Sequence, residues 1–369
     1  MSGRSGIRRL RRGRDRAAVR GRKSTQSGVR KSSRRKKGQA GPAERHVRYR
    51  RLREVRHSLM GALVECVPNF SEGRDTGIVE AVAASIAAVD GVHLAGMEMD
   101  GDHNRSVITF MGSPEDVARG AFEACRTARD LIDLRRHRGA HPRIGATDVI
   151  PFIPLSSYSM DDSITLARDC GGEIGRSLGI PVYFYGHAAP DARRGELPDI
   201  RRGGFEGLVE RARQAQLAQH DQQEPDLAPD AGPGMVHATA GATAVGVRDI
   251  LVAYNVNLDT DDVRVARTIA QEVREKNGGL PGVRALGLLL PGRHLAQVSM
   301  NLTDYQQTDM ARAFEAVARL AEAQGVEVLE SELIGLAPHD ALGGAAPGDL
   351  RMKPLDPDRY LETHTSRFD

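Results

Sequence analysis

The sequence predicts an α/β (α+β) protein built from two βαββαβ subdomains, each a sheet covered by helices, with a substrate cleft or tunnel between them. Two observations predict this class. From residue 60 onward, short apolar runs of strand length alternate with amphipathic segments of helix length. The same order of elements then occurs twice. Between the two copies, residues 212–234 are rich in Gln, Asp, Pro and Ala, which is typical of a linker or a long surface loop.

The first subdomain is assigned to residues 60–235. Apolar runs mark its strands, and apolar positions at helical spacing mark its helices. Ser113 is an N-cap followed by Pro114 at the first helical position, which fixes the start of the second helix. The expected elements are, in order, strand 62–68, helix 75–89, strands 91–99 and 105–112, helix 114–134, strand 146–154, helix 161–177 and strand 180–186.

The second subdomain is assigned to residues 236–345. Its expected elements are strand 248–258, helix 260–276, strands 283–290 and 295–305, helix 308–325 and strand 326–335. Both halves contain the order β-α-β-β-α-β, which is the ferredoxin-like order. Each sheet buries one face under its helices, so a cleft between the two layers is expected. Residues 346–369, rich in Pro, Asp and Arg, are expected to form a loose C-terminal tail.

The net charge of +3 conceals two regions of opposite charge. Residues 1–59 hold 22 Lys and Arg but 3 Asp and Glu, whereas the remainder holds 30 basic and 46 acidic residues. The first region has too few apolar residues for a core and is expected to be a basic disordered extension. Three hypotheses account for it: a transit peptide, a nucleic-acid-binding tail, or an upstream start that the natural protein does not use, with Met60 as the true start. A mass spectrum of the native protein beginning at Met1 would contradict the last hypothesis.

The body of the chain has the composition of a cytoplasmic protein. Hydrophobic residues make up 40% of the sequence, and its three cysteines lack the spacing of a disulfide framework or a metal site. The longest apolar runs are too short to cross a membrane, so no membrane association is expected. No metal ligand set stands out either, and no metal is assigned.

The stretch RRHRGAHPRIGATDVIPFIP, residues 135–154, concentrates charge in front of an apolar strand. A capping or loop histidine is one interpretation of His141. The other is a proton-transfer group, because it lies in a loop between a helix and a strand, is followed by the rigid Pro142, and stands among arginines that suit carboxylate ligands. His137, nearer the helix end, is the weaker candidate.

Two further polar stretches follow predicted strands. CVPNFSEGRD (66–75) can cap the next helix or line a cleft, and EMDGDHNRS (98–106) is a polar turn or a set of ligand-binding side chains. The Gly-rich stretch 232–248 has neither a phosphate-binding lysine nor a dinucleotide fingerprint. It permits close approach of the backbone to a flat ligand, or acts as a flexible hinge.

Six blocks of this sequence together resemble the glutamate formimidoyltransferase (formiminotransferase) family, over residues 62 to about 342. They are LVECVPNFSEG, HNRSVITF, RRHRGAHPRIGATDVIPFIP, GATAVGVRDILVAYNVNL, LAQVSMNLTDY and ESELIGLAP. The resemblance implies transfer of the formimino group from N-formimidoyl-L-glutamate to N5 of tetrahydrofolate, with release of glutamate, in histidine degradation. It implies tetrahydrofolate as co-substrate without a metal, and a homodimer. The chain looks like a stand-alone form without the cyclodeaminase domain of animal members.

The resemblance also implies site residues. The catalytic histidine of the family falls on His141, which would accept a proton from N5 and donate one to the leaving nitrogen. The folate-lining segment falls on Gly232, Pro233, Gly234, Met235, Val236, His237, Ala238, Thr239, Ala240 and Gly241, which lacks the aromatic residues of animal members. The side chains expected to bind substrate are Asn69, Glu72, Glu98, Asp100, Asn104, Arg105, Arg143, Asn255, Asn257 and Asn301. Glu98 and Asp100 are alternatives for assisting His141.

Three alternative functions remain at this point. A folate-dependent formyltransferase would move a formyl group instead, and a formiminoglutamate hydrolase would release glutamate without folate. A nucleic-acid-binding protein would act through residues 1–59, with an affinity that falls steeply with salt.

Overall fold

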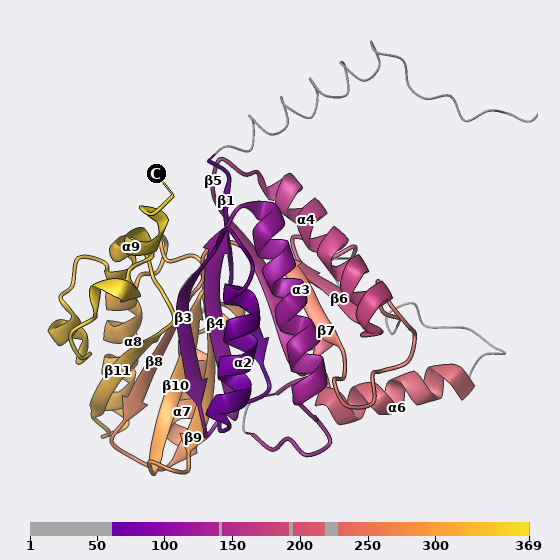
Figure 1. Ribbon diagram of the computed structural model, residues 1–369. Coiled ribbons are helices and arrows are strands. Elements are labelled where there is room, and N and C mark those ends of the chain that lie inside the picture. The colour runs from indigo at the N-terminus through magenta and orange to yellow at the C-terminus, as the bar shows by residue number, and fades with distance from the viewer. Residues whose placement is uncertain (1–60, 140–141, 192–194, 218–227, 369) are drawn as a thin grey trace, which may run out of the picture. The chain divides into compact units, whose positions relative to one another are not determined.

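The computed structural model describes residues 61–368 except 140–141, 192–194 and 218–227. Within these residues the chain is a mixed α/β protein with two sheets and associated helices (Figure 1). Among them, no helix has both the length and the apolar character needed to cross a membrane. The basic extension expected at residues 1–59 lies outside the described residues.

The first sheet and its helices occupy residues 63–247. Its strands are β1 (Leu63–Cys66), β2 (Asn69–Phe70), β3 (Val92–Asp100), β4 (Arg105–Gly112), β5 (Thr147–Ser156), β6 (Val182–Gly186) and β7 (Thr243–Val247). Its helices are α2 (Thr76–Ala87), α3 (Pro114–Leu131), α4 (Met160–Glu173) with a π-helical continuation (Ile174–Leu178), α5 (Leu197–Ile200) and α6 (Gly204–Leu217). Each element expected in this half is present, within a few residues of its expected bounds.

The strand order of this sheet is β1-β4-β2-β5-β7-β6, and β3 pairs with the outer side of β4. β1 and β2 both lie between β4 and β5, so they are two pieces of the single strand expected at 62–68. Pro68 separates them, because proline has no N–H to donate to a ladder. The polar residues that follow β2 therefore emerge in the middle of the sheet, between the ends of β4 and β5.

One face of this sheet is covered by α2, α3 and α4 (Figure 1). Their apolar positions, such as Ile86, Ala121 and Ala167, form one buried cluster with β-strand residues such as Phe110 and Phe152. The caps agree with the sequence: Ser113 accepts a hydrogen bond from the backbone N–H of Asp116 at the start of α3.

The second sheet has the order β11-β8-β10-β9, with every neighbouring pair antiparallel. Its strands are β8 (Val252–Leu258), β9 (Val283–Leu290), β10 (Leu295–Leu302) and β11 (Val328–Ile334), and its helices are α7 (Val263–Val273) and α8 (Met310–Ala323). Alternate strand residues such as Tyr254 and Val298 point to these helices and form a second core. The polar residues between them lie on the opposite face.

Three expectations about segment boundaries need correction. A boundary between residues 235 and 236 would cut the first sheet, because β7 pairs in parallel with β5 and β6. Residues 243–247 are all buried in that strand, so this part of the Gly-rich stretch is not a flexible hinge. Of the linker expected at 212–234, residues 212–217 belong to α6, and residues 230–231 bond to Val182 at the edge of β6.

Residues 346–368 do not form a loose tail. Leu350, Met352 and Leu361 are buried, and the last of these belongs to the short helix α9 (Leu361–Thr365). The backbone N–H of Ser331 in β11 donates to the carbonyl of Arg351 at 3.1 Å. Proline and charge suggested disorder, but these three apolar side chains are spaced so that each one packs onto the body.

Candidate functional site

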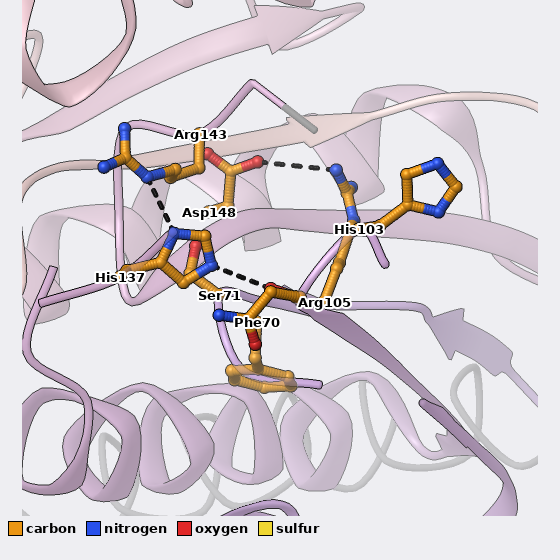
Figure 2. A pocket seen from close by; sticks show the side chains of 8 residues that line it. Phe70, Ser71, His103, Arg105, His137, Arg143 and Asp148 are labelled. Atoms are coloured by element: carbon orange, nitrogen blue, oxygen red, sulfur yellow. Dashed lines mark hydrogen bonds and ion pairs between the residues drawn. The ribbon is translucent and has the colours of Figure 1, made fainter. Parts of the chain in front are cut away.

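A small pocket lies where β2, β4 and β5 meet their adjoining loops. It is lined by Phe70, Ser71, His103, Asn104, Arg105, His137, Arg143 and Asp148 (Figure 2). Its lining comes from three separate places in the sequence: the end of β2, the turn between β3 and β4, and the segment that leads into β5. The three polar stretches singled out in the sequence therefore meet at one place.

Arg105, the first residue of β4, points its guanidinium into this pocket beside β2. Its Nε donates to Oδ1 of Asn69 at 2.8 Å, and its Nη2 donates to the same oxygen. Its Nη1 lies 3.8 Å from Oδ2 of Asp148. Asn69 and Arg105, two of the ten residues predicted to bind substrate, are thus held together, with the amide orienting the guanidinium.

Asp148 is a buried carboxylate with two partners. Its Oδ1 accepts the backbone N–H of Ile144 at 2.8 Å, and its Oδ2 accepts Nη2 of Arg201 at 2.6 Å. Arg201 caps the C-terminus of α5, and its buried Nε has no hydrogen-bond partner in the structure. Asp148 therefore pairs most closely with Arg201 and more distantly with Arg105.

The pocket carries an excess of positive charge. Burial and, to a lesser extent, the nearby charge of Arg201 lower the pKa of Arg105 to about 9, whereas the charge of Asp148 opposes this shift. Arg105 still carries a proton at neutral pH. The residues that line the pocket include two arginines, Arg105 and Arg143, and one carboxylate, that of Asp148. Such a site favours an anion, and the planar guanidinium matches a carboxylate.

Arg143 is fixed on the opposite side of the pocket. Both of its Nη atoms donate to the carboxylate of Glu206 at 2.9 Å, and its guanidinium lies 6.0 Å from the ring centroid of Phe205. Its Nε donates to Nδ1 of His137 at 3.0 Å (Figure 2). The arginine that the sequence offered to a carboxylate ligand therefore already holds one, which is 63% exposed and belongs to α6.

His137 has a structural role here. Because Arg143 can only donate, Nδ1 of His137 accepts, and Nε2 carries the proton that is donated to the carbonyl of Asn104 at 2.8 Å. Burial lowers the pKa of His137, and the charge of Arg143 adds to this, although the hydrogen bond to Asn104 opposes it. The ring is therefore neutral and links the 137–143 segment to the β3–β4 turn.

The side chain of Asn104 links its own turn to two other loops by hydrogen bonds. Its Oδ1 accepts the N–H of Gly73 at 3.0 Å, and its Nδ2 donates to the carbonyl of Arg138 at 3.1 Å. Its φ of 50° is left-handed, a conformation that asparagine tolerates better than most residues. These bonds hold the side chain in place at the pocket, which Asn104 also lines.

The predicted carboxylates lie in three different settings. Glu72 accepts the N–H groups of Gly73, Arg74 and Asp75 at 2.8–3.0 Å, so it caps its own turn. Glu98 accepts the N–H of Gly335 at 2.5 Å and forms an ion pair with Arg359. Asp100 bonds to His103, whose ring lines the pocket. Of the two alternatives for assisting a histidine, Asp100 is the one at the pocket, and its described partner is His103.

The asparagines of the second sheet lie outside the residues that line this pocket. Nδ2 of Asn255 donates to Glu332 at 3.2 Å, and Nδ2 of Asn257 donates to Glu330 at 3.1 Å. Gln297 donates to both Asn257 and Glu332, so these groups form a polar network across β8, β10 and β11. Asn301 lies on the same face of β10 with an exposed side chain.

The segment Gly232–Gly241 is joined by backbone hydrogen bonds to the segment that leads into β5. The carbonyl of Thr239 accepts the N–H of Leu134 at 2.9 Å, and the carbonyl of Ala240 accepts the N–H of Ala146 at 2.8 Å. Gly241 (φ 71°) packs so closely that a Cβ there would lie 2.1 Å from the carbonyl oxygen of Ile144. His141 lies outside the described residues, between Gly139 and Pro142, which are described.

Sequence reasoning missed Asp148, Arg201 and Glu206. Asp148 gave one signal, a charged residue at the start of an otherwise apolar strand. Arg201 and Glu206 gave none, because both lie among many exposed charges in the sequence and reach the pocket through the placement of α5 and α6. Within the described part of the chain, no group of His, Cys, Asp and Glu side chains has the arrangement of a metal site.

Comparison with known proteins gives the family. A family model described as "Formiminotransferase domain, N-terminal subdomain" matches residues 63–248, and one described as "Formiminotransferase domain" matches residues 253–349. The change of domain between them agrees with the end of β7.

Relatives of known activity cover most of the chain. Glutamate formimidoyltransferase of Thermoplasma acidophilum is 44% identical over 301 residues, which are 82% of this chain and 96% of that protein. The protein of the same name from Streptococcus pyogenes serotype M1 is 39% identical over 83% of this chain and 99% of its own length. Formimidoyltransferase-cyclodeaminase of Sus scrofa is 41% identical over 78% of this chain but 52% of its own length. The chain therefore belongs to the glutamate formimidoyltransferase family of one-carbon transferases.

Proposed function

We propose that this protein transfers the formimino group of N-formimidoyl-L-glutamate to N5 of tetrahydrofolate and releases glutamate, as a cytoplasmic step of histidine degradation. Family membership over most of the chain supports the reaction. The main structural support is a pocket lined by two arginines and one carboxylate, with Arg201 also paired to Asp148, since the donor is a dicarboxylate. Tetrahydrofolate acts as co-substrate, and no metal is required.

The charge of the pocket supports assigning it to the donor: Arg105, which lines it, would bind a carboxylate of the glutamate part. The larger folate would lie against the segment 232–241. Two contacts support a folate position next to the pocket. The hydroxyl of Ser71, which lines the pocket, donates to the carbonyl of Gly145, and Gly145 forms a β-bridge with Gly241.

The reaction needs two proton transfers. N5 uses its lone pair to form a bond to the formimino carbon, and the π electrons of the C=N bond move to nitrogen. The N5 proton must then leave, and the glutamate nitrogen must gain a proton as its bond to carbon breaks. The family resemblance assigns proton transfer to His141, and a positioned acid–base group contributes roughly 10²–10⁴-fold.

We also propose that each half is ferredoxin-like and that the protein is a homodimer. The order β11-β8-β10-β9 supports the first statement for the second half, because it matches the fourth, first, third and second strands of a βαββαβ unit. In the first half the same relation holds for β5, β1, β4 and β3, with β7 and β6 added beyond β5. A substrate cleft between the halves is part of this proposal.

The test follows glutamate release from N-formimidoyl-L-glutamate, with and without tetrahydrofolate, for the full chain and its His141→Ala variant. We expect folate-dependent release that falls at least about 100-fold in the variant. Arg126→Gln, which removes an exposed ion pair on α3, is the control and should leave the rate unchanged. Release without folate would identify a hydrolase, and equal transfer from N-formyl-L-glutamate would identify a formyltransferase.

A further inference from the structure

We propose that His103, oriented by Asp100, is a second acid–base residue of this pocket and protonates the nitrogen of the departing glutamate. This inference rests on the proposed transfer reaction and deepens it. It concerns the turn between β3 and β4.

Two hydrogen bonds join the side chain of Asp100 to residue 103. Nδ1 of His103 lies 2.5 Å from Oδ2 of Asp100, and the backbone N–H of His103 donates to Oδ1 at 2.8 Å. The imidazole is 12% exposed and lines the pocket beside Arg105 (Figure 2). A ring held from one edge by a carboxylate and facing a pocket has the arrangement used for directed proton transfer.

The carboxylate of Asp100 fixes the tautomer of the His103 ring. Burial alone would raise the pKa of Asp100, but the hydrogen bonds from His103 outweigh it and keep that pKa below its usual value. Asp100 is therefore ionised at neutral pH and accepts the Nδ1 proton. Nε2 is then the ring nitrogen on the side away from Asp100.

The other described histidine of the pocket has the opposite environment. His137 accepts a hydrogen bond from Arg143, and both the cation and burial disfavour a second proton on its ring. His103 has a carboxylate in the place where His137 has a guanidinium. Of these two rings, His103 is the one that the protein prepares to hold a positive charge, as a general acid must.

The turn that carries His103 is rigidly held. Asn104 bonds to Gly73 on one side and to Arg138 on the other. Gly139 packs so closely that a Cβ there would lie 2.1 Å from the carbonyl oxygen of His103. A positioned acid gains its effect from this kind of fixed geometry.

In the proposed step the protonated His103 gives its Nε2 proton to the glutamate nitrogen of the tetrahedral intermediate. The bond between that nitrogen and the formimino carbon breaks, and its electron pair stays on the glutamate nitrogen, which leaves as a neutral amine. A lone pair on the other nitrogens of the intermediate re-forms the C=N bond of the product. His103 becomes neutral and regains a proton from solvent before the next turnover.

The test compares His103→Asn with wild type in the full chain. The Asn amide can replace the Nδ1 donor to Asp100, so the turn is retained while the titrating nitrogen is lost. We expect kcat to fall about 10²–10³-fold, with KM for the donor changed less than about threefold and the loss of one limb of the kcat–pH profile. Asp100→Asn should lower kcat while shifting that limb to lower pH. His339→Asn, an exposed histidine, is the control.

The outcomes separate this inference from the proposed function. A wild-type protein without folate-dependent release would overturn the proposed function itself. An active wild type with a His103→Asn variant of the same kcat and pH profile would overturn the role of His103 alone. A variant that loses thermal stability and kcat but keeps both limbs of the profile would also overturn it, because a purely structural role moves no titration.

Discussion

The pocket contains two arginine–carboxylate pairs that differ in burial, and this difference predicts their energetics. Asp148 pairs with Arg201 at 2.6 Å, with side chains 3% and 11% exposed. Glu206 pairs with Arg143 in bidentate fashion at 2.9 Å, but its side chain is 63% exposed. We compare Asp148→Asn with Glu206→Gln, two isosteric changes that each remove one negative charge.

The expected loss of unfolding free energy follows from solvent access. Removing one partner of a buried pair leaves an uncompensated buried charge and costs about 3–5 kcal/mol. In Asp148→Asn the unpaired charge is that of Arg201, and Arg105 lies near it. The new Asn amide also places an N–H group against the Nη2 donor of Arg201. In Glu206→Gln, water solvates the released guanidinium edge, and the cost is about 0–1 kcal/mol. The two variants should therefore differ by about 2–5 kcal/mol.

Urea unfolding of the full-length protein measures both values. We expect the midpoint to fall markedly for Asp148→Asn at an unchanged m-value, and to change little for Glu206→Gln. Adding Arg201→Met to Asp148→Asn should recover part of the loss, because it removes the unpaired charge. Equal losses in the two single variants, or no recovery in the double variant, would refute the assignment of burial as the cause.

Three further predictions concern other parts of the molecule. Burial raises the pKa of Glu65 to about 7 despite Arg248, so the folded state holds a proton that the unfolded state releases near 4.5. Stability should thus fall as pH rises from 4.5 to 7, by on the order of 3 kcal/mol, and Glu65→Gln should remove this slope in urea titrations at several pH values. Gly139→Ala should lower both activity and stability by displacing the β3–β4 turn, whereas Gly348→Ala, where a Cβ meets nothing within 4 Å, should be neutral in the same assays. Deleting residues 346–369 should cost several kcal/mol, roughly 1.5–3 for each buried apolar side chain lost, and an unchanged melting temperature would restore the view of a loose tail.

Most of the fold could be predicted from the sequence because its elements follow local rules. Period-two and helical apolar patterns, with caps such as Ser113 and Pro114, define segments that the structure reproduces. β7 was missed because its five residues, TAVGV, lie next to a run of Gly and Thr that is equally typical of a loop. Its identity as a strand depends on pairing with β5 and β6, which are distant in sequence, and single-sequence patterns carry no information on that pairing.

The candidate site could be located from the sequence but not assembled from it. Polar residues after apolar runs correctly indicated the three loops that meet at the pocket. The sequence could not tell a side chain that meets a ligand from one that meets another loop: Asn104, Glu72 and Asn257 are all committed within the protein. These roles depend on backbone groups that become neighbours only after folding.

The positive charge of residues 135–143, just before β5, has a physical explanation. The arginine-rich stretch before this strand is partly structural, because Arg143 holds Glu206 and His137. The excess positive charge of the pocket comes instead from Arg105 and Arg201, which share the one carboxylate of Asp148. Two guanidinium groups around a single carboxylate leave a net positive charge at low solvent access, and a carboxylate ligand would offset it. Under the proposed function, a carboxylate of the donor would balance this charge.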